Sequence, residues 1–163
     1  LQKISARSKM GVVIIRPPLV YGTGVKGNFS SLIKLTKTRF PLPFNGIDNK
    51  RSLVFVGNLV SLIELAKDHP NADGEIFLVS DGMDISTTRL IEIIYAGSGG
   101  KAKMFKIPQI IWKLFLNLIG KGVIYTRLFE NLQVDISLTQ KKLGWCPKFS
   151  VEHGIYETIN GRN

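Results

Sequence analysis

The hydrophobic pattern begins with a short, continuous apolar run. Residues 11–16 (GVVIIR) place four β-branched side chains in a row, and Pro17 and Pro18 follow directly. Such a run is typical of a strand buried on both faces of a parallel sheet. Proline has no N–H for the strand ladder, so the pattern predicts that this strand ends at Pro17 and continues as a loop.

Helical and extended patterns then alternate irregularly. A helix is predicted over residues 28–38, opening at Asn28, which is also a candidate cap. Asn58, Ser86 or Thr87, and Ser150 are predicted to cap later helices, because their side-chain oxygens accept from free backbone N–H groups. The other expected elements are strands at 52–56 and 75–79, extended chain at 40–46 and 104–107, and helices at 58–67, 87–96, 108–119, 124–131, 137–143 and after residue 150.

The first strand raises a question of partners. A parallel strand leaves unpaired backbone groups at its edges, and the chain has few other strand candidates. One interpretation is that residues 11–16 belong to a larger fold whose N-terminal part is missing here. The alternative is pairing with residues 53–56 or 76–79.

Composition narrows the class of protein. With 163 residues, 44% of them hydrophobic and 21% charged, the chain has ordinary globular composition, which excludes a disordered tail. The single Cys146 excludes an internal disulfide, and with two histidines it cannot build a structural zinc site, so we expect a cytoplasmic protein. Polar residues, Gly and Pro interrupt the apolar stretch at 107–125, so no membrane span is expected. We also expect no metal site, since Asp81 and Asp84 fit a turn and a cap region.

Charge is unevenly distributed within the formal net charge of +10. Residues 1–51 hold ten basic residues and one acidic, residues 52–99 two basic and seven acidic, and residues 100–163 ten basic and four acidic. Basic groups from the first and last thirds could converge on an anion. There is no basic run and no interleaving of basic with aromatic residues, so a nucleic-acid motif is lacking.

Several segments together resemble a known family. VIIRPPLVYG at residues 13–22 resembles the sixth strand and following loop of extended short-chain dehydrogenases, and more closely of nucleotide-sugar epimerases and dehydratases of the UDP-glucose 4-epimerase type. The likeness continues in order through LPF at 42–44, NKRSLVFV at 49–56, VSDG at 79–82, VDIS at 134–137, LGW at 143–145 and Pro147. The resemblance implies an α/β chain: a terminal Rossmann-type parallel strand (residues 1–27) followed by a mixed α+β substrate lobe (residues 28–163).

Two family motifs have no counterpart in the sequence. No glycine-rich dinucleotide fingerprint follows a strand, and none of the four tyrosines has a lysine four residues later, as the family's catalytic Tyr-x-x-x-Lys pair requires. By resemblance, that pair would precede the chain, on a helix whose tail is residues 1–6. We therefore expect the C-terminal portion of such an enzyme, with no catalytic residue of its own and inactive alone.

The resemblance also assigns binding roles. Arg51, directly before a strand, matches the arginine that contacts the diphosphate, and Arg127 is a second candidate. Asn28 and Phe29 match nucleotide or sugar contacts. Leu42 and Phe44 match the segment that lies along the uracil, with a core role as the alternative for Phe44. Pro17 and Pro18 match the loop that closes over nicotinamide, whereas Leu19 departs from the asparagine common in relatives, which leaves the particular sugar open.

The implied function is UDP-sugar recognition within an NAD- or NADP-dependent 4-epimerase, reductase or dehydratase of surface-polysaccharide sugar synthesis. There, hydride passes between sugar C4 and nicotinamide while the tyrosine moves the hydroxyl proton. The implied partners are the UDP-sugar, the enzyme's N-terminal half, and a second copy in a homodimer; no tightly bound cofactor is expected on this chain. The alternatives are a small basic nucleic-acid-binding module and a protein-interaction module using the surface of residues 107–125.

Overall fold

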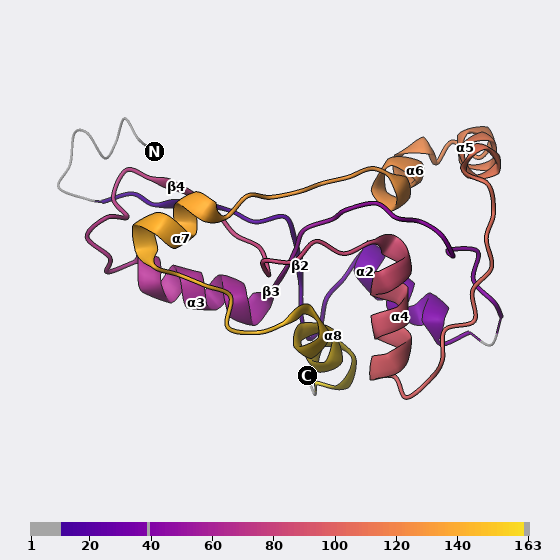
Figure 1. Ribbon diagram of the computed structural model, residues 1–163, viewed down its shortest axis with the longest axis horizontal. Helices are drawn as coiled ribbons and strands as arrows, with labels where there is room; N and C mark the ends of the chain where they lie inside the picture. The colour runs from indigo at the N-terminus through magenta and orange to yellow at the C-terminus, as the bar shows by residue number, and fades with distance from the viewer. Residues whose placement is uncertain (1–10, 39, 162–163) are drawn as a thin grey trace. The chain divides into compact units, whose positions relative to one another are not determined.

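A computed structural model describes residues 11–38 and 40–161 (Figure 1). The helix tail predicted for residues 1–6 lies outside this part of the chain. The described residues form two compact units, the first comprising 11–22, 52–83 and 134–154 and the second comprising 23–51, 84–133 and 155–161. These units interleave along the sequence.

Short parallel strands and longer helices make up the described residues, as expected for a mixed α/β chain. The strands are β1 (Ile14–Arg16), β2 (Leu19–Tyr21), β3 (Leu53–Phe55) and β4 (Ile76–Leu78). The helices are α2 (Asn28–Thr36), α3 (Val56–Ala66), α4 (Thr87–Gly97), α5 (Gln109–Leu118), α6 (Gly122–Phe129), α7 (Ser137–Leu143) and α8 (Val151–Asn160).

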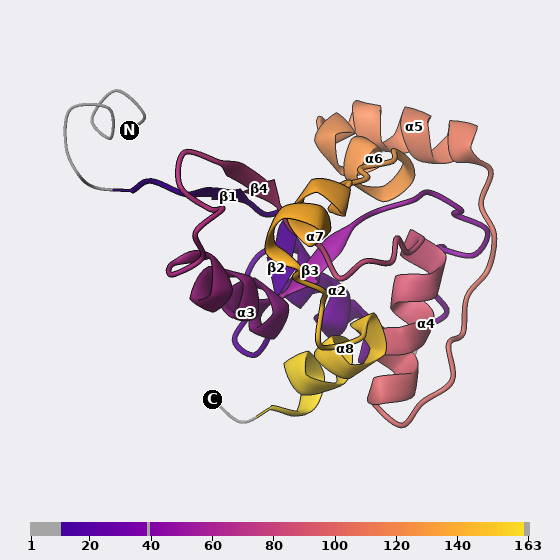
Figure 2. The same ribbon diagram turned by 60° about the vertical axis from the view of Figure 1, so that its left-hand side comes forward.

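The first strand has a partner within the chain. β1 runs parallel to β4, with Ile14 opposite Ile76 and Arg16 opposite Leu78 (Figure 2). This is the pairing with residues 76–79, and it occupies one edge of β1. The prediction that this strand is buried on both faces is wrong, because Ile15 is only half-buried and Arg16 is exposed.

A second strand follows the prolines, where the sequence predicted a loop. β2 runs parallel to β3, with Leu19 opposite Leu53 and Tyr21 opposite Phe55. Pro17 and Pro18 do end β1, but pairing resumes at once because the residues after them again carry backbone N–H groups. The prolines therefore separate two consecutive strands that pair with different partners.

Each unit contains an apolar core among its described residues. In the first, α3 packs against β3 and α7 against β4, around the buried residues Val54, Leu62, Ala66, Ala72, Phe77, Val79, Ile136, Leu143 and Trp145. In the second, α2 packs against α4, and the core consists of Leu42, Phe44, Ile47, Ile91 and Tyr95.

Two of the predicted helix caps are confirmed, and one is wrong. The Ser86 hydroxyl accepts from Arg89 N at 3.0 Å, and the Ser150 hydroxyl accepts from His153 N at 3.2 Å, which confirms both. Asn58 is no cap, because α3 begins at Val56 and places Asn58 inside the helix, fully buried. Gly27 takes the cap position of α2, with a φ of 73° that favours glycine, and the side chain of Asn28 lies outside what is described.

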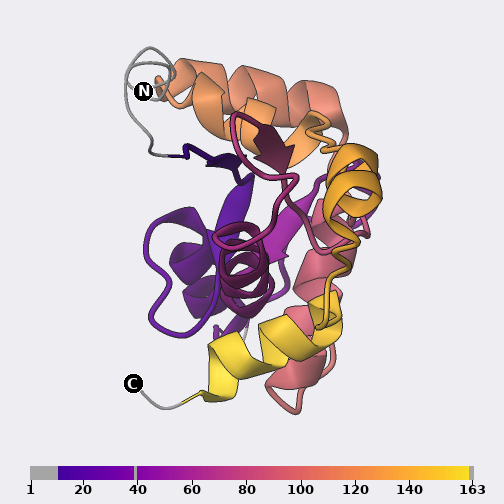
Figure 3. The same ribbon diagram turned by 90° about the vertical axis from the view of Figure 1, so that its left-hand side faces the viewer.

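Helices α5 and α6 form a helical hairpin in the second unit (Figure 3). Pro108 precedes α5 at its cap position, and Gly120 turns the chain with a φ of 68°. α6 begins at Gly122, two residues before the predicted start. No helix within the described ranges is both long enough and apolar enough to cross a membrane.

Candidate functional site

Arg51 lies in the second unit, between two backbone segments. Its N–H donates to Ile85 O at 3.1 Å and its carbonyl accepts from Ile85 N at 3.0 Å, while Leu132 N donates to Lys50 O at 2.8 Å. On the side chain, Nη1 donates to Glu130 O at 3.0 Å. The backbone and one guanidinium nitrogen of Arg51 are therefore fixed, although the side chain is only half-buried.

Arg127 lies close enough to Arg51 for their charges to interact. Burial lowers the pKa of Arg51, the positive charge of Arg127 lowers it further, and Glu130 opposes both. Arginine nonetheless stays protonated in proteins. Neither arginine forms an ion pair with a carboxylate among the described residues, so the two cations form a pair that an anion would stabilise.

Two polar residues whose role here sequence analysis missed hold this pair in place. Thr87, at the start of α4, donates its hydroxyl to Leu128 O at 2.9 Å at the end of α6. Its backbone N donates to Asn49 Oδ1 at 2.8 Å, and Asn49 Nδ2 donates to Glu130 O at 3.4 Å. Buried Asn and Thr in ordinary loop and cap positions carry no pattern in the sequence that marks such a role.

Phe44 belongs to the core of the second unit. Its ring stacks on Trp112 at a centroid distance of 5.6 Å and an angle of 13°, and its carbonyl accepts from the Thr88 hydroxyl at 2.7 Å. Leu42 is also buried and lies opposite Met104, with its N–H donating to Lys103 O at 2.8 Å and its carbonyl accepting from Phe105 N at 2.9 Å. The core alternative for Phe44 is therefore the one observed, and both side chains are covered by protein.

The other predicted residues belong to other elements. Phe29, on α2 of the second unit, is buried, and Asn28 is described only as the first residue of that helix. Pro17 and Pro18 belong to the first unit, between β1 and β2. Within the second unit, the structure thus brings Arg51 and Arg127 together.

The first unit contains a buried polar cluster around Asp81, which sequence analysis interpreted as a turn residue. One carboxylate oxygen, Oδ2, accepts from the Tyr21 hydroxyl at 2.7 Å. The other, Oδ1, accepts from Phe55 N and from Asn58 Nδ2, both at 2.8 Å. We call Tyr21, Asn58 and Asp81 the Asp81 cluster; turn geometry itself falls to the next residue, Gly82, with a φ of 76°.

Electrostatics show what the Asp81 cluster can do. Burial raises the pKa of Asp81, and the hydrogen bonds from Tyr21, Asn58 and Phe55 oppose that rise. Burial and the charge of Asp81 together raise the pKa of the Tyr21 hydroxyl. Tyr21 therefore stays a hydrogen-bond donor and is unsuited to acid–base chemistry near neutral pH.

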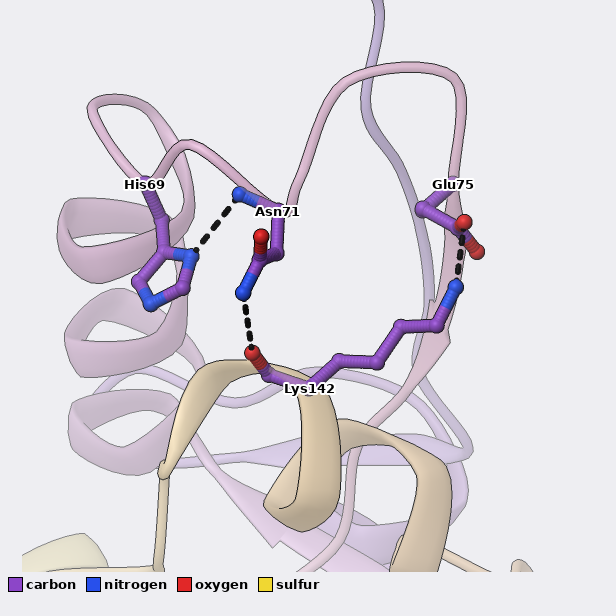
Figure 4. Close-up of polar contacts among 4 residues, drawn as sticks. All are labelled: His69, Asn71, Glu75 and Lys142. Carbon is purple, nitrogen blue, oxygen red and sulfur yellow. Dashed lines mark hydrogen bonds and ion pairs between the residues drawn. The ribbon is translucent and has the colours of Figure 1, made fainter.

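Another polar cluster of the first unit joins α7 to the loop before β4 (Figure 4). Lys142 forms an ion pair with Glu75, Asn71 Nδ2 donates to Lys142 O at 3.4 Å, and Asn71 N donates to His69 Nδ1 at 3.2 Å. Each charged group here already has a partner. Across the described ranges, no group of three or more His, Cys, Asp and Glu residues is placed to hold a metal ion.

Sequence comparison adds an independent observation. No family model matches the chain. It is, however, 45% identical over 159 residues to a UDP-glucose 4-epimerase from Vibrio cholerae, a match that covers 97% of this chain and 48% of that protein. The chain spans about half the length of the curated relatives it matches.

Solved structures show the same fold. UDP-glucuronic acid 4-epimerase from Bacillus cereus in complex with NAD matches with a TM-score of 0.70 and 18% identity, over 98% of this chain and 45% of its own. UDP-glucose 4-epimerase from Thermotoga maritima with UDP-glucose matches with a TM-score of 0.65 and 20% identity, over 96% and 48%. The predicted resemblance is thus confirmed: this α/β chain is similar, in sequence and fold, to the C-terminal portion of nucleotide-sugar epimerases and dehydratases of the extended short-chain dehydrogenase type.

Proposed function

We propose that this chain is the UDP-sugar recognition part of an NAD- or NADP-dependent nucleotide-sugar 4-epimerase, reductase or dehydratase. The observation that carries the proposal is the 45% identity to a UDP-glucose 4-epimerase over nearly the whole chain. The arginine pair adds a physical reason, because both arginines fall within residues 28–163, to which the resemblance assigns the substrate.

Arg51 and Arg127 suit a diphosphate for electrostatic reasons. The positive charge of Arg127 lowers the pKa of Arg51, and an anion that binds between the two guanidinium groups relieves this repulsion. Arg51 makes one side-chain hydrogen bond among the described residues, to Glu130 O, so other N–H donors of its fork remain for phosphate oxygens. We assign the diphosphate of the UDP-sugar to this pair.

The stacked rings of Phe44 and Trp112 support the segment that we assign to the nucleoside. Phe44 is covered by Trp112, which also lies 6.1 Å from the ring of Phe129. We assign residues 42–44 a supporting role beneath the uracil, with Leu42 and Phe44 holding the segment to the core. Asn28 and Phe29, at the start of α2, are assigned to the nucleotide or sugar.

The described residues do not by themselves fit the nicotinamide cofactor. Pro17 and Pro18 lack backbone N–H groups, the sequence has no glycine-rich fingerprint, and Tyr21 is buried in the Asp81 cluster. We therefore assign this chain positioning and charge neutralisation, and no proton or hydride transfer. For the complete enzyme, our proposal adds the cofactor and the N-terminal half, with Pro17 and Pro18 against the nicotinamide. It also includes a homodimer and a role in cytoplasmic surface-polysaccharide sugar synthesis.

Titration calorimetry with UDP tests the assignment. We expect the Arg51→Ala variant to bind UDP about 10- to 100-fold more weakly than the unchanged chain, since a hydrogen bond to a charged group contributes about 1.5–3 kcal/mol. Arg51→Lys should recover only part of the loss because lysine lacks the planar fork. The matched control is Arg89→Ala on α4, an exposed arginine already paired with Glu92, which should leave UDP binding unchanged.

Three results would contradict parts of the proposal. Equal UDP affinity for the Arg51→Ala and Arg89→Ala variants would remove the arginine pair from the binding site. Tight, steeply salt-dependent binding of a mixed-sequence oligonucleotide, with no binding of UDP, would favour the nucleic-acid alternative. Epimerisation of UDP-glucose by the 163-residue chain alone would contradict the assignment of catalysis to residues outside it.

A further inference from the structure

Helix α5 is apolar on nearly every side. Gln109, Lys113 and Asn117 form its single polar stripe at a spacing of four residues, and Trp112 and Leu116 face the protein. The remaining positions form two neighbouring apolar stripes on the outside. We call these the α5 outer face: Ile110, Ile111, Leu114, Phe115 and Leu118.

This outer face is exposed to a degree unusual for such residues. Leu118 is 86% exposed, Leu114 65% and Ile110 60%, and Val123 on the adjacent α6 is 65% exposed. Single exposed apolar residues need no explanation, but a contiguous patch marks an interaction surface. Since α5 has ten residues, it is about 15 Å long and could lie along a surface but not cross a bilayer.

The charges of the sequence that contains α5 and its neighbouring segments indicate the partner of this face. Residues 93–129 contain no Asp or Glu, although 12 occur in the whole chain. The same stretch holds six exposed basic residues, Lys101, Lys103, Lys106, Lys113, Lys121 and Arg127. An apolar helix face bordered by lysines, without acidic residues, is the composition of helices that lie in the interface of anionic membranes.

We propose that the α5 outer face docks on an anionic lipid surface. The apolar side chains would enter the boundary between headgroups and acyl chains, while Lys113 and Lys121 contact lipid phosphates. The proposal rests on the exposure and charge of this hairpin and does not depend on the UDP-sugar assignment.

Charge also argues against a second copy as the occupant. In a two-fold symmetric contact the same patch meets itself, so Lys113 and Lys121 of both copies would approach one another. No acidic residue in the stretch 93–129 is present to offset that repulsion. Anionic lipid headgroups neutralise the same lysines.

Co-sedimentation with vesicles tests the proposal on the complete 163-residue chain. We expect binding to vesicles of phosphatidylcholine with roughly one third phosphatidylglycerol, and little binding to phosphatidylcholine alone. Leu114→Ser with Leu118→Ser should reduce the partition coefficient about tenfold or more, because two exposed leucines no longer enter the lipid. Lys113→Gln with Lys121→Gln should reduce it less and remove most of the salt dependence.

The matched control carries Val60→Ser and Ile63→Ser on α3 of the first unit, where exposure is 44% and 47%. We expect this variant to bind vesicles like the unchanged chain, and circular dichroism should show all variants folded. Equal vesicle binding by the α5 and α3 variants, or no binding of the unchanged chain to anionic vesicles, would overturn the proposal. A dimer that dissociates on the leucine substitutions, without vesicle binding, would overturn it in favour of a contact between copies.

Discussion

The Asp81 cluster of the first unit and the arginine pair of the second are both charged, but their surroundings differ. Asp81 is 7% exposed, and both of its carboxylate oxygens accept hydrogen bonds from Tyr21, Asn58 and the backbone of Phe55. Arg51 and Arg127 instead face each other's positive charge, and no carboxylate pairs with either among the described residues.

This difference separates structure from function. A buried charge whose hydrogen bonds are all made inside the protein has nothing left for a ligand, and it fixes the elements that surround it. Two like charges at a partly open site lower stability slightly and are relieved by an anion. The Asp81 cluster is therefore the feature we expect to control folding, and the arginine pair the one we expect to control binding.

Removing the Asp81 carboxylate should have the largest effect on stability. Asp81→Ala leaves the Tyr21 hydroxyl, Asn58 Nδ2 and Phe55 N without their acceptor, and we expect a loss of about 3 kcal/mol or more in the free energy of unfolding. Urea denaturation followed by circular dichroism measures this loss. The control, Asp68→Ala, removes a carboxylate with 79% side-chain exposure and should change stability by less than about 0.5 kcal/mol. Equal losses in the two variants would contradict a structural role for the cluster.

Gly154 on α8 tests how tightly the same cluster is packed. A Cβ at this position would lie 2.7 Å from the Tyr21 hydroxyl oxygen and 2.8 Å from Phe55 Cγ. Alanine favours a helix more than glycine does, yet we expect Gly154→Ala to lower the free energy of unfolding by about 1–3 kcal/mol because overpacking forces these rings to move. A gain in stability would show that the Tyr21 ring shifts without cost.

The raised pKa of Asp81 predicts a smaller, pH-dependent effect. Burial raises the native pKa above the ordinary value of 3.8, so between these two values the native state binds more protons than the unfolded state. Its contribution to stability is present below pH 3.8 and is lost as the pH rises through the native pKa. The Asp81→Asn variant has no titrating group at this position and therefore lacks this pH-dependent contribution. Its stability relative to the unchanged chain should rise as the pH increases from 3.8 to the native pKa of Asp81, and then level off. Urea denaturation at a series of pH values, with each variant referred to the unchanged chain, measures the difference; one that stays constant with pH would contradict the prediction.

The sequence predicted the elements better than their partners. Local patterns located α7 correctly and placed β3 and β4 within about a residue at each end, because periodicity and caps act over a few residues. The strand β2 was missed because the preceding prolines are strong local signals of chain breaks, whereas its pairing with β3 spans more than thirty residues. Asn58 resembles a cap locally, but buried hydrogen bonds to Asp81 and to the chain at Lys148 and Phe149 place it within a helix.

The candidate site shows the same division. Arg51 and Arg127 were identified through a resemblance, since no local pattern links residues 76 positions apart. Their proximity depends on Asn49 and Thr87, whose hydrogen bonds join segments distant in the sequence. Phe44 was open to either a binding or a core role, and its core position became visible only through its stacking with Trp112.

Of the substitutions proposed here, replacing Arg127 should change the free energy of unfolding least. It should raise this free energy, whereas Asp81→Ala and Gly154→Ala should lower it. Arg127 lowers the pKa of Arg51, so its charge is unfavourable in the absence of an anion. Because both side chains contact solvent, screening limits the gain, and we expect Arg127→Gln to raise the free energy of unfolding by only a few tenths of a kcal/mol, roughly. The same variant should bind UDP about tenfold more weakly, since a charged contact to phosphate is lost.

Thermal unfolding and titration calorimetry on one preparation measure both quantities. Arg89→Gln is the control, because Arg89 pairs with Glu92 on α4 and its loss should lower stability slightly while leaving UDP binding unchanged. If Arg127→Gln instead lowers stability as Arg89→Gln does, Arg127 already has a favourable partner within the protein. The arginine pair would then resemble the Asp81 cluster, and the distinction between a closed structural cluster and an open binding pair would fail. In a binding site for an anion, replacing one of two repelling cations must both raise the stability of the free protein and weaken binding.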